Sequence, residues 1–257
     1  MEKKKLTVKK LDTKNLKDVM SLQSKIIANL KPDEQHFILH RTAEDYVKSL
    51  TGKSSNMLGV FDGEELIAQI VYCLPQNGES RDMPEFRPEM ENKDLVIYEA
   101  ILVNPQYRGA SLMKRMLEYI ENNALDEGRK HSIIQIAIDN PASWINALHH
   151  GMSITKVDND PSDGVEVIYL EKPITHHKDI KPLNTDKSYS LYLGNDIHKK
   201  IPSLFKKMQY LISKGYHGIN LNKETKSLVW QKSETELSNT LHFNQILQKN
   251  KSNGLYV

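Results

Sequence analysis

Apolar residues recur along this chain at two spacings, which divide it into predicted strands and helices. Alternating or nearly continuous apolar runs predict strands at 5–12, 57–61, 65–74, 95–103, 132–138 and 164–173. Apolar residues three and four positions apart predict helices at 13–27, 42–52, 110–126 and 140–151. Strands 95–103 and 132–138 are almost wholly apolar and one helix joins them. We therefore expect them to pair in parallel and to be covered on both faces.

The character of the chain changes at residue 174, which indicates a second unit. Residues 174–186 are polar and contain prolines, as is typical of a linker. Beyond them the patterns predict a strand, a helix, a hairpin and a final helix, at 188–193, 196–215, 217–231 and 233–248. The predicted parts are thus a domain at 1–173, a linker at 174–186 and a basic α/β appendage at 187–257. A piece as small as the appendage buries little core alone, so we expect it to pack on the larger domain.

Length and composition restrict the class of protein. The 257 residues suffice for one large domain, or for a medium domain with a small one. No run approaches the roughly 18 apolar residues of a membrane helix, and the basic start MEKKKLTVKK lacks the apolar stretch of a secretory signal. The single cysteine, Cys73, reads as a core residue and excludes an intramolecular disulfide, which fits a reducing compartment. We therefore expect a cytoplasmic protein with no membrane partner.

The net charge of +2 hides an asymmetry between the two parts. Residues 1–174 carry 22 basic and 27 acidic residues, whereas 175–257 carry 13 lysines and 6 acidic residues. The acidic part, 1–174, suits a cationic substrate. The basic tail, 175–257, either contacts an acidic surface or keeps the protein soluble. The aromatic residues of the tail fall at a spacing that favours packing over nucleic-acid binding: Tyr189, Tyr192, Tyr210, Tyr216 and Trp230. No Cys/His spacing of a zinc site occurs, so no metal is predicted.

The stretch 101–117, ILVNPQYRGASLMKRML, leaves a predicted buried strand through a narrow turn and enters a helix at once. Such a turn presents unpaired backbone N–H groups at the positive end of the helix dipole, which favours phosphate. Gly109 permits close backbone approach, and Arg108 adds a charge. The turn alone does not decide between an anion site and an ordinary strand–helix junction.

This stretch resembles the acyl-CoA-binding motif of the GNAT superfamily of N-acyltransferases, Gln/Arg-x-x-Gly-x-Gly/Ala, usually after Val-x-Pro. The matching positions are Val103, Pro105, Gln106 and Gly109. Ser111 stands where Gly or Ala is usual, and Met113 where a further Gly is common. A second motif, IQIAIDNPASWINALHHGM, and the order of the elements also agree, so the resemblance covers residues 1–173.

The resemblance implies an α/β (α+β) fold with a GNAT-like mixed central sheet and flanking helices, plus the small C-terminal α/β extension. It also implies acetyl-CoA as the acyl donor. Backbone N–H groups of the turn would hold its pyrophosphate, at Arg108, Gly109, Ala110, Ser111, Leu112 and Met113. The pantetheine amides would pair where strands 95–103 and 133–138 splay apart, at Ile101, Leu102 and Val103. Asn140 would contact the pantetheine arm.

Attack on a thioester requires an amine that has lost its proton, and an alkylammonium has a pKa near 10. Glu99, inside VIYEAILV, is the candidate general base, because GNAT enzymes often use a glutamate on this strand. The alternative is a buried carboxylate paired with a Lys or Arg. In the GNAT superfamily a tyrosine on the short helix after Asn140 commonly protonates the departing thiolate. Its place falls at Ala147, so this tyrosine is absent here. His149 and His150 lie near, at positions more typical of structural or exposed histidines.

Two functions remain open at this level. The favoured one is an N-acetyltransferase that moves an acetyl group from acetyl-CoA to a primary amine of a small molecule or a protein. The alternative is a catalytically weak CoA-binding module whose basic extension recruits a macromolecular partner. The polar loop 76–94 is long enough to be functional. Its Glu85, Glu89 and Glu91 either face a cationic substrate or are solvated.

Overall fold

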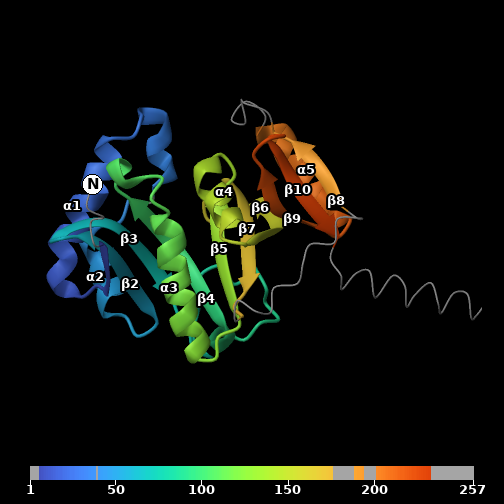
Figure 1. The fold of residues 1–257 in the computed structure, drawn as a ribbon. Coiled ribbons are helices and arrows are strands. Elements are labelled where there is room, and N and C mark those ends of the chain that lie inside the picture. Colours follow the sequence, from blue (N-terminus) through green and yellow to red (C-terminus); the bar gives the residue numbers. More distant parts are fainter. Residues whose placement is uncertain (1–5, 39, 176–187, 194–200, 233–257) are drawn as a thin grey trace, which may run out of the picture.

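One mixed sheet with flanking helices organises the chain, which confirms the predicted fold class (Figure 1). The structure is a computed structural model that describes residues 6–38, 40–175, 188–193 and 201–232. The strands are β1 (Leu6–Lys10), β2 (Ser55–Asp62), β3 (Glu65–Cys73), β4 (Leu95–Val103), β5 (His131–Ala137), β6 (Ser153–Asn159), β7 (Glu166–Pro173), β8 (Ser188–Tyr192), β9 (Tyr216–Asn222) and β10 (Ser227–Lys232). The α-helices are α1 (Leu16–Ala28), α2 (Ala43–Thr51), α3 (Leu112–Asp126), α4 (Pro141–His149) and α5 (Ile201–Ser213). Short 3-10 turns are η1 (Thr13–Asn15), η2 (Pro32–Phe37), η3 (Asn92–Asp94) and η4 (Pro105–Tyr107).

The strand order is β1-β2-β3-β4-β5-β7-β6-β9-β10-β8. Every neighbouring pair is antiparallel except β4 and β5, which are parallel. The predicted βαβ unit is thus present as β4, α3 and β5. Among the described residues, no helix combines the length and the apolar character needed to cross a bilayer.

Helices cover both faces of the sheet, because the strands bury side chains on both sides. Apolar residues of α3, α4 and α5 join the largest core cluster, with Met116, Trp144 and Met208 all fully buried. On the other face α1 and α2 pack with a second cluster that includes Val19 and Tyr46. Each buried Leu or Ile of these faces contributes about 1.5–3 kcal/mol to folding, which holds β4 and β5 in place for the site.

The sequence patterns missed one strand, β6. Its ladder with β7 shifts register between Ile154 and Lys156, and this bulge breaks the apolar alternation that marks a strand. The predicted helix at 233–248 and most of the predicted linker at 174–186 lie outside the described residues.

The appendage continues the sheet through the described strands β8, β9 and β10. β9 meets β6 at one residue pair, Ile154 and Gly218, and α5 packs against β6 and β9. A Cβ placed at Gly218 would come within 3.3 Å of the Ile154 side chain and 3.4 Å of the Trp230 ring. The expected packing of the appendage on the larger domain is therefore present, and it depends on the close approach that glycine allows.

Candidate functional site

The parallel pair β4–β5 opens halfway along its length. The two strands pair only over 95–98 of β4 and 131–134 of β5. Beyond this point β4 stays paired with β3 up to Val103, and β5 stays paired with β7 up to Ala137. The facing edges therefore carry backbone N–H and C=O groups outside the β4–β5 ladder, and an extended ligand with amide groups can pair with such edges.

The turn after β4 is built around the buried residue Asn104. The backbone N–H of Asn104 donates to the carbonyl of Ile67 at 2.9 Å, and its side-chain Oδ1 accepts from the N–H of Gln106 at 3.2 Å. Gly109 and Ser111 then take left-handed backbone angles, with φ of +82° and +55°. Left-handed residues next to a helix start curl the backbone so that successive N–H groups form a concave anion site.

Ser111 is the N-cap of α3, and its side chain makes no capping hydrogen bond. A residue with a Cβ loses about 1 kcal/mol in the left-handed conformation that Ser111 adopts, whereas glycine adopts it freely. This strain gives a physical reason for the glycine that is common at this place in the motif quoted above.

The first turn of α3 offers donors and positive charge. The backbone N–H groups of Ser111, Leu112 and Met113 have no acceptor among the described residues. They point along the positive end of the helix dipole. Arg108 is exposed and brings a guanidinium to the same turn. This combination of donors and charge matches the chemistry of a phosphate group.

Asn140 follows the end of β5 and caps the N-terminus of α4. Its side-chain oxygen accepts from the N–H of Ser143 at 3.2 Å. Because parallel strands finish at the same edge of a sheet, Asn140 and the turn after β4 lie at one edge, on either side of the opened pair. The structure thus brings together the three predicted parts of a cofactor site, although Asn140's contact with a pantetheine arm stays a prediction.

Glu99 is the extra residue of a β-bulge. Val71 of β3 lies opposite Ala100, whereas the next residue, Tyr72, lies opposite Tyr98, so Glu99 has no partner in the β3–β4 register. Tyr98 is buried on the α3 face, and Ala100 packs on the α1/α2 face. The bulge therefore reverses the alternation of β4 at the point where β4 leaves β5.

Glu99 is held by an arginine from the segment before α2. Its Oε2 accepts a hydrogen bond from Nη2 of Arg41 at 2.6 Å, and the side chains are only 15% and 12% exposed. The backbone N–H and carbonyl of Arg41 both bond to the side chain of Gln23, at 3.1 and 2.9 Å. Nη1 donates to Ser49 at 3.2 Å. Arg41 is therefore fixed in place before any ligand binds.

Burial raises the pKa of Glu99 above its usual 4.5, although the charge and hydrogen bond of Arg41 oppose the shift. A weaker influence in the raising direction comes from Asp82, in the loop between β3 and β4. This geometry agrees with both expectations for Glu99. The carboxylate pairs with an arginine, as in the structural alternative, and burial raises its pKa in the direction that is useful to a base. Its role as a base stays a prediction.

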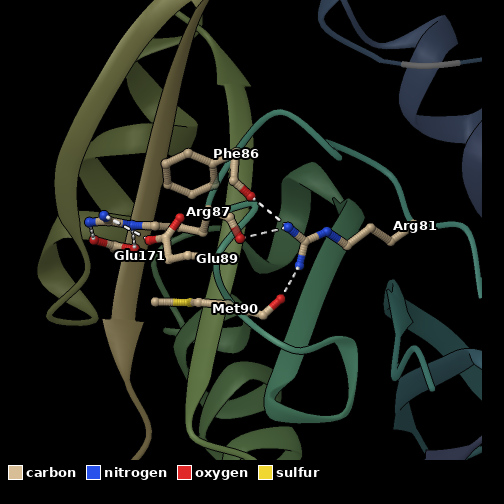
Figure 2. A network of polar contacts seen from close by, with 6 residues as sticks. All are labelled: Arg81, Phe86, Arg87, Glu89, Met90 and Glu171. Atoms are coloured by element: carbon tan, nitrogen blue, oxygen red, sulfur yellow. Dashed lines mark hydrogen bonds and ion pairs between the residues drawn. The ribbon is translucent and has the colours of Figure 1, made fainter. Parts of the chain in front are cut away.

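The loop 76–94 folds over the sheet and is pinned there by two arginines (Figure 2). Arg81 donates to three carbonyls of the loop itself, those of Phe86, Arg87 and Met90. Arg87 reaches out of the loop and pairs bidentately with Glu171 of β7. The ring of Phe86 fills a small core cluster under the loop. These contacts hold the loop in one position beside β4.

The three loop carboxylates singled out from the sequence have local partners. Glu85 accepts from the hydroxyl of Tyr169 at 3.0 Å, Glu89 lies 3.5 Å from Arg87, and Glu91 lies 2.7 Å from Lys93. The loop acid that acts on Glu99 is Asp82 instead. Sequence reasoning missed both Asp82 and Arg41, since no local pattern links either residue to Glu99.

The place expected for an acid on α4 holds no titratable group. Ala147 is fully buried in the core. The neighbouring His150 belongs to a buried network, in which its Nε2 lies 3.0 Å from Glu121 and Lys172 donates to the same carboxylate at 2.7 Å. His150 is therefore structural, as expected for a histidine near a helix end, and His149 is exposed. Among the described residues, no cluster of three or more His, Cys, Asp or Glu is arranged to hold a metal ion.

Comparison with known families gives one match. The family model described as "Acetyltransferase (GNAT) family" matches residues 23–152. This range runs from α1 through the opened strands and the turn to the residues just after α4. No curated protein matches the sequence at a significant level.

Solved structures share the fold at low sequence identity. A probable acetyltransferase from Staphylococcus epidermidis ATCC 12228 is 14% identical, with a TM-score of 0.52 over 66% of this chain and 100% of that one. An N-acetyltransferase from Staphylococcus aureus Mu50 is 13% identical, with a TM-score of 0.51 over 66% and 98%. The ribosomal-protein-S18-alanine N-acetyltransferase from Escherichia coli is 13% identical, with a TM-score of 0.50 over 70% and 100%. At these identities the likeness extends to the fold alone.

Proposed function

Because the chain belongs to the acetyltransferase (GNAT) family, we propose that it transfers the acetyl group of acetyl-CoA to the nitrogen of an amine. One observation carries the proposal. The opening between β4 and β5 lies beside a turn in which the N–H groups of Ser111, Leu112 and Met113 have no acceptor among the described residues. A ligand that joins a diphosphate to a chain of amides fits both features at once.

The residues of this chain fit such a ligand. Acetyl-CoA would supply an acyl carbon activated as a thioester. The turn 108–113 would hold the pyrophosphate, residues 101–103 of β4 would pair with the pantetheine amides, and Asn140 would contact the arm. Nothing lies within 4 Å of a Cβ built on Gly109, so the space in front of the turn is open to a phosphate.

The reaction forms a C–N bond between the amine and the acyl carbon, breaks the C–S bond, and moves one proton from nitrogen to sulfur. In the proposal Glu99 accepts the amine proton, directly or through water. The raised pKa of Glu99 strengthens its affinity for that proton, and Arg41 holds the carboxylate in one orientation through the 2.6 Å contact. A thiol with a pKa near 8.5 leaves readily, so water can protonate the sulfur where a tyrosine is missing at Ala147.

The charges near Glu99 favour a cationic acceptor. Glu99 and Asp82 both carry negative charge on the acceptor side of β4, and Arg41 offsets one of them. An ammonium group is attracted to such a site before it loses its proton. The acceptor class is therefore the primary amine of a small molecule or a protein.

Calorimetric titration with acetyl-CoA tests the cofactor half of the proposal. Gly109→Glu should weaken binding by well over tenfold, because it places a carboxylate where the pyrophosphate is expected. Gly128→Glu is a matched control, since Gly128 also has a positive φ, +79°, and equally open surroundings, but lies at the far end of α3. Wild-type protein that binds no CoA at millimolar concentration would contradict the proposal.

Turnover of a panel of primary amines tests the catalytic half. Glu99→Gln should lower the rate about 100-fold or more, with partial recovery at high pH, where the amine loses its proton unaided. Glu89→Gln, an exposed loop carboxylate, should leave the rate within twofold of wild type. CoA binding without turnover of any amine would favour the alternative function, a binding module with a partner-recruiting extension.

A further inference from the structure

The appendage contains a second ligand-sized cavity, remote from β4. Its volume is about 620 Å³, and residues of α5, β8, β9 and β10 line it. This volume falls in the range of roughly 300–1,000 Å³ that is typical of small-molecule sites. The buried side chains Leu191 and Leu211 contribute its apolar lining. We call it the lysine–tyrosine pocket, after the seven other side chains that line it.

Four lysines give this pocket its charge. Lys206 and Lys207 belong to α5, Lys214 follows its last residue, and Lys232 ends β10. None of the four makes an ion pair with any residue that the structure describes. The lining includes no acidic residue, and Glu224 is the only acidic side chain in the described ranges 188–193 and 201–232. The pocket is thus a concentrated positive site with no internal counter-charge.

Three tyrosines line the same cavity, and two of them are largely exposed. Tyr189 is 49% exposed and Tyr210 is 62% exposed, whereas Tyr216 is half-buried. The expectation that the aromatic residues of the tail pack in a core holds for Trp230, which is fully buried. It is wrong for Tyr189, Tyr210 and also Tyr192, which is 62% exposed. Core packing does not use these aromatic faces, and Nζ of Lys214 lies over the Tyr210 ring, 5.7 Å from its centroid.

We propose that the lysine–tyrosine pocket binds a nucleotide, with the base against tyrosine rings and the phosphates on the lysines. Base–aromatic stacking contributes about 1–3 kcal/mol per base, and lysines hold phosphates as point charges. Lys206 lies in α5 and Lys214 directly follows its end, eight residues later, so at the helical rise the two lysines are about 12 Å apart along the cavity. A base with its sugar and phosphates spans a comparable length.

The aromatic lining distinguishes this ligand from an acidic peptide. Carboxylates need only the lysines, whereas the exposed rings of Tyr189 and Tyr210 match a planar base. The nucleotide could be free or could belong to a single-stranded nucleic acid, because both present the same groups. The pocket is separate from the CoA turn, since β5, β7 and β6 lie between β4 and β9. At about 4.8 Å per strand, four strand spacings correspond to roughly 19 Å. The intervening strands can be followed in Figure 1.

The experiment measures binding to the full-length protein by two probes. Calorimetry with ADP reports a free nucleotide, and anisotropy of a fluorescein-labelled eight-residue single-stranded RNA reports the polymer. We expect at least one probe to bind with a micromolar Kd. Binding of the RNA alone identifies a polymer site, and binding of ADP with equal or higher affinity identifies a free nucleotide. For RNA, a plot of log K against log salt should have a slope of about −1.4 to −2.8, since two to four phosphates of a single strand are neutralised.

Variants at exposed positions locate the site. Lys214→Glu should weaken binding at least tenfold, because it replaces a phosphate contact by repulsion. Tyr210→Ala should weaken it at least fivefold through loss of stacking. Lys223→Glu is the matched control, since this exposed lysine carries the same charge on the β9–β10 turn, outside the pocket, and should change Kd less than twofold. Gly109→Glu should leave Kd unchanged, which separates this site from the CoA turn.

Four results would overturn the proposal. The first is the absence of binding by both probes at 1 mM. The second is an equal loss in Lys223→Glu and Lys214→Glu, which would indicate attraction to net charge alone. The third is unchanged binding in Tyr210→Ala. The fourth is equally tight binding of a polyglutamate peptide that matches the RNA in charge, because an acidic peptide would then satisfy the pocket without a base.

Discussion

Replacement of Arg41 by methionine isolates the balance of forces on Glu99. Methionine keeps a long unbranched side chain but removes the guanidinium that bonds Glu99 at 2.6 Å. Burial then acts on the carboxylate with no cation to oppose it, so the pKa of Glu99 should rise further. A hydrogen bond to a charged group contributes about 1.5–3 kcal/mol, and one pKa unit corresponds to 1.36 kcal/mol. The expected rise is therefore about one to two units.

A ¹³C NMR titration of glutamate carboxyl groups measures this rise without any acceptor. The Glu99 resonance is assigned as the one that disappears in Glu99→Gln. Gln23→Ala is a useful companion variant, because it loosens the backbone of Arg41 while keeping its charge. It should shift the pKa of Glu99 in the same direction but by less.

Stability against pH gives an independent measurement with a definite sign. A carboxyl whose pKa is higher in the folded protein than its unfolded value near 4.5 binds its proton more tightly when folded. Its contribution to stability is then greatest at low pH and is lost as pH rises from 4.5 through the folded pKa. Urea unfolding of Arg41→Met should therefore show a loss as pH rises above 4.5 that is larger than in wild type by about 1–3 kcal/mol.

The double variant Arg41→Met/Glu99→Gln should lack this extra loss, because it has no carboxyl at position 99. A pKa of Glu99 that stays within half a unit of wild type, or falls, would refute the reasoning. The pKa of Glu99 would then be set by groups other than Arg41, and the pairing of Glu99 with Arg41 through the bulge would not control it.

Two further changes probe the buried charges and the turn. Glu121→Gln should destabilise the protein by about 3 kcal/mol at neutral pH, because it leaves Lys172 and His150 beside an uncharged amide. Burial alone would raise the pKa of Glu121, but His150 and Lys172 lower it below its usual value. Its contribution is therefore present above pH 4.5 and is lost as pH falls through the folded pKa, so urea unfolding of wild type and variant should converge in acid. Ser111→Gly should stabilise the protein by up to about 1 kcal/mol in thermal melts, since it relieves a left-handed residue, and a clear loss of stability would contradict the strain argument.

Local pattern predicted the strand, the turn and the helix that the proposed cofactor site uses. The apolar run of β4, the turn with Gly109 and the helical spacing of α3 are all short-range signals, and the structure places them as expected. The left-handed conformation of Ser111 was not foreseen, because serine is not a marker of positive φ. Parallel pairing followed from the single helix between the two strands.

The surroundings of Glu99 depend on contacts that no local pattern encodes. Arg41 and Glu99 are 58 residues apart, and the bulge that turns Glu99 toward the arginine becomes visible only once the register with β3 is known. The polar residues of the loop 76–94 give no sign in sequence of how it is held. Its order comes from Arg81 and Arg87, whose partners are loop carbonyls and a carboxylate on β7. A bulge likewise hid β6, since alternation is the only local sign of a strand.

The junction of β6 and β9 has a consequence for how the sheet opens. The two strands meet at Ile154 and Gly218, while β6 keeps a full ladder with β7 and β9 keeps one with β10. Separation at this junction breaks few backbone hydrogen bonds, so the cost of opening lies mainly in exposing the side chains packed around Gly218. The appendage should therefore open as one cooperative unit below the global free energy of unfolding. In native-state hydrogen exchange, amides of β9 and β10 should share one opening free energy, and amides of β4, β5 and β7 a higher one, within a single continuous sheet.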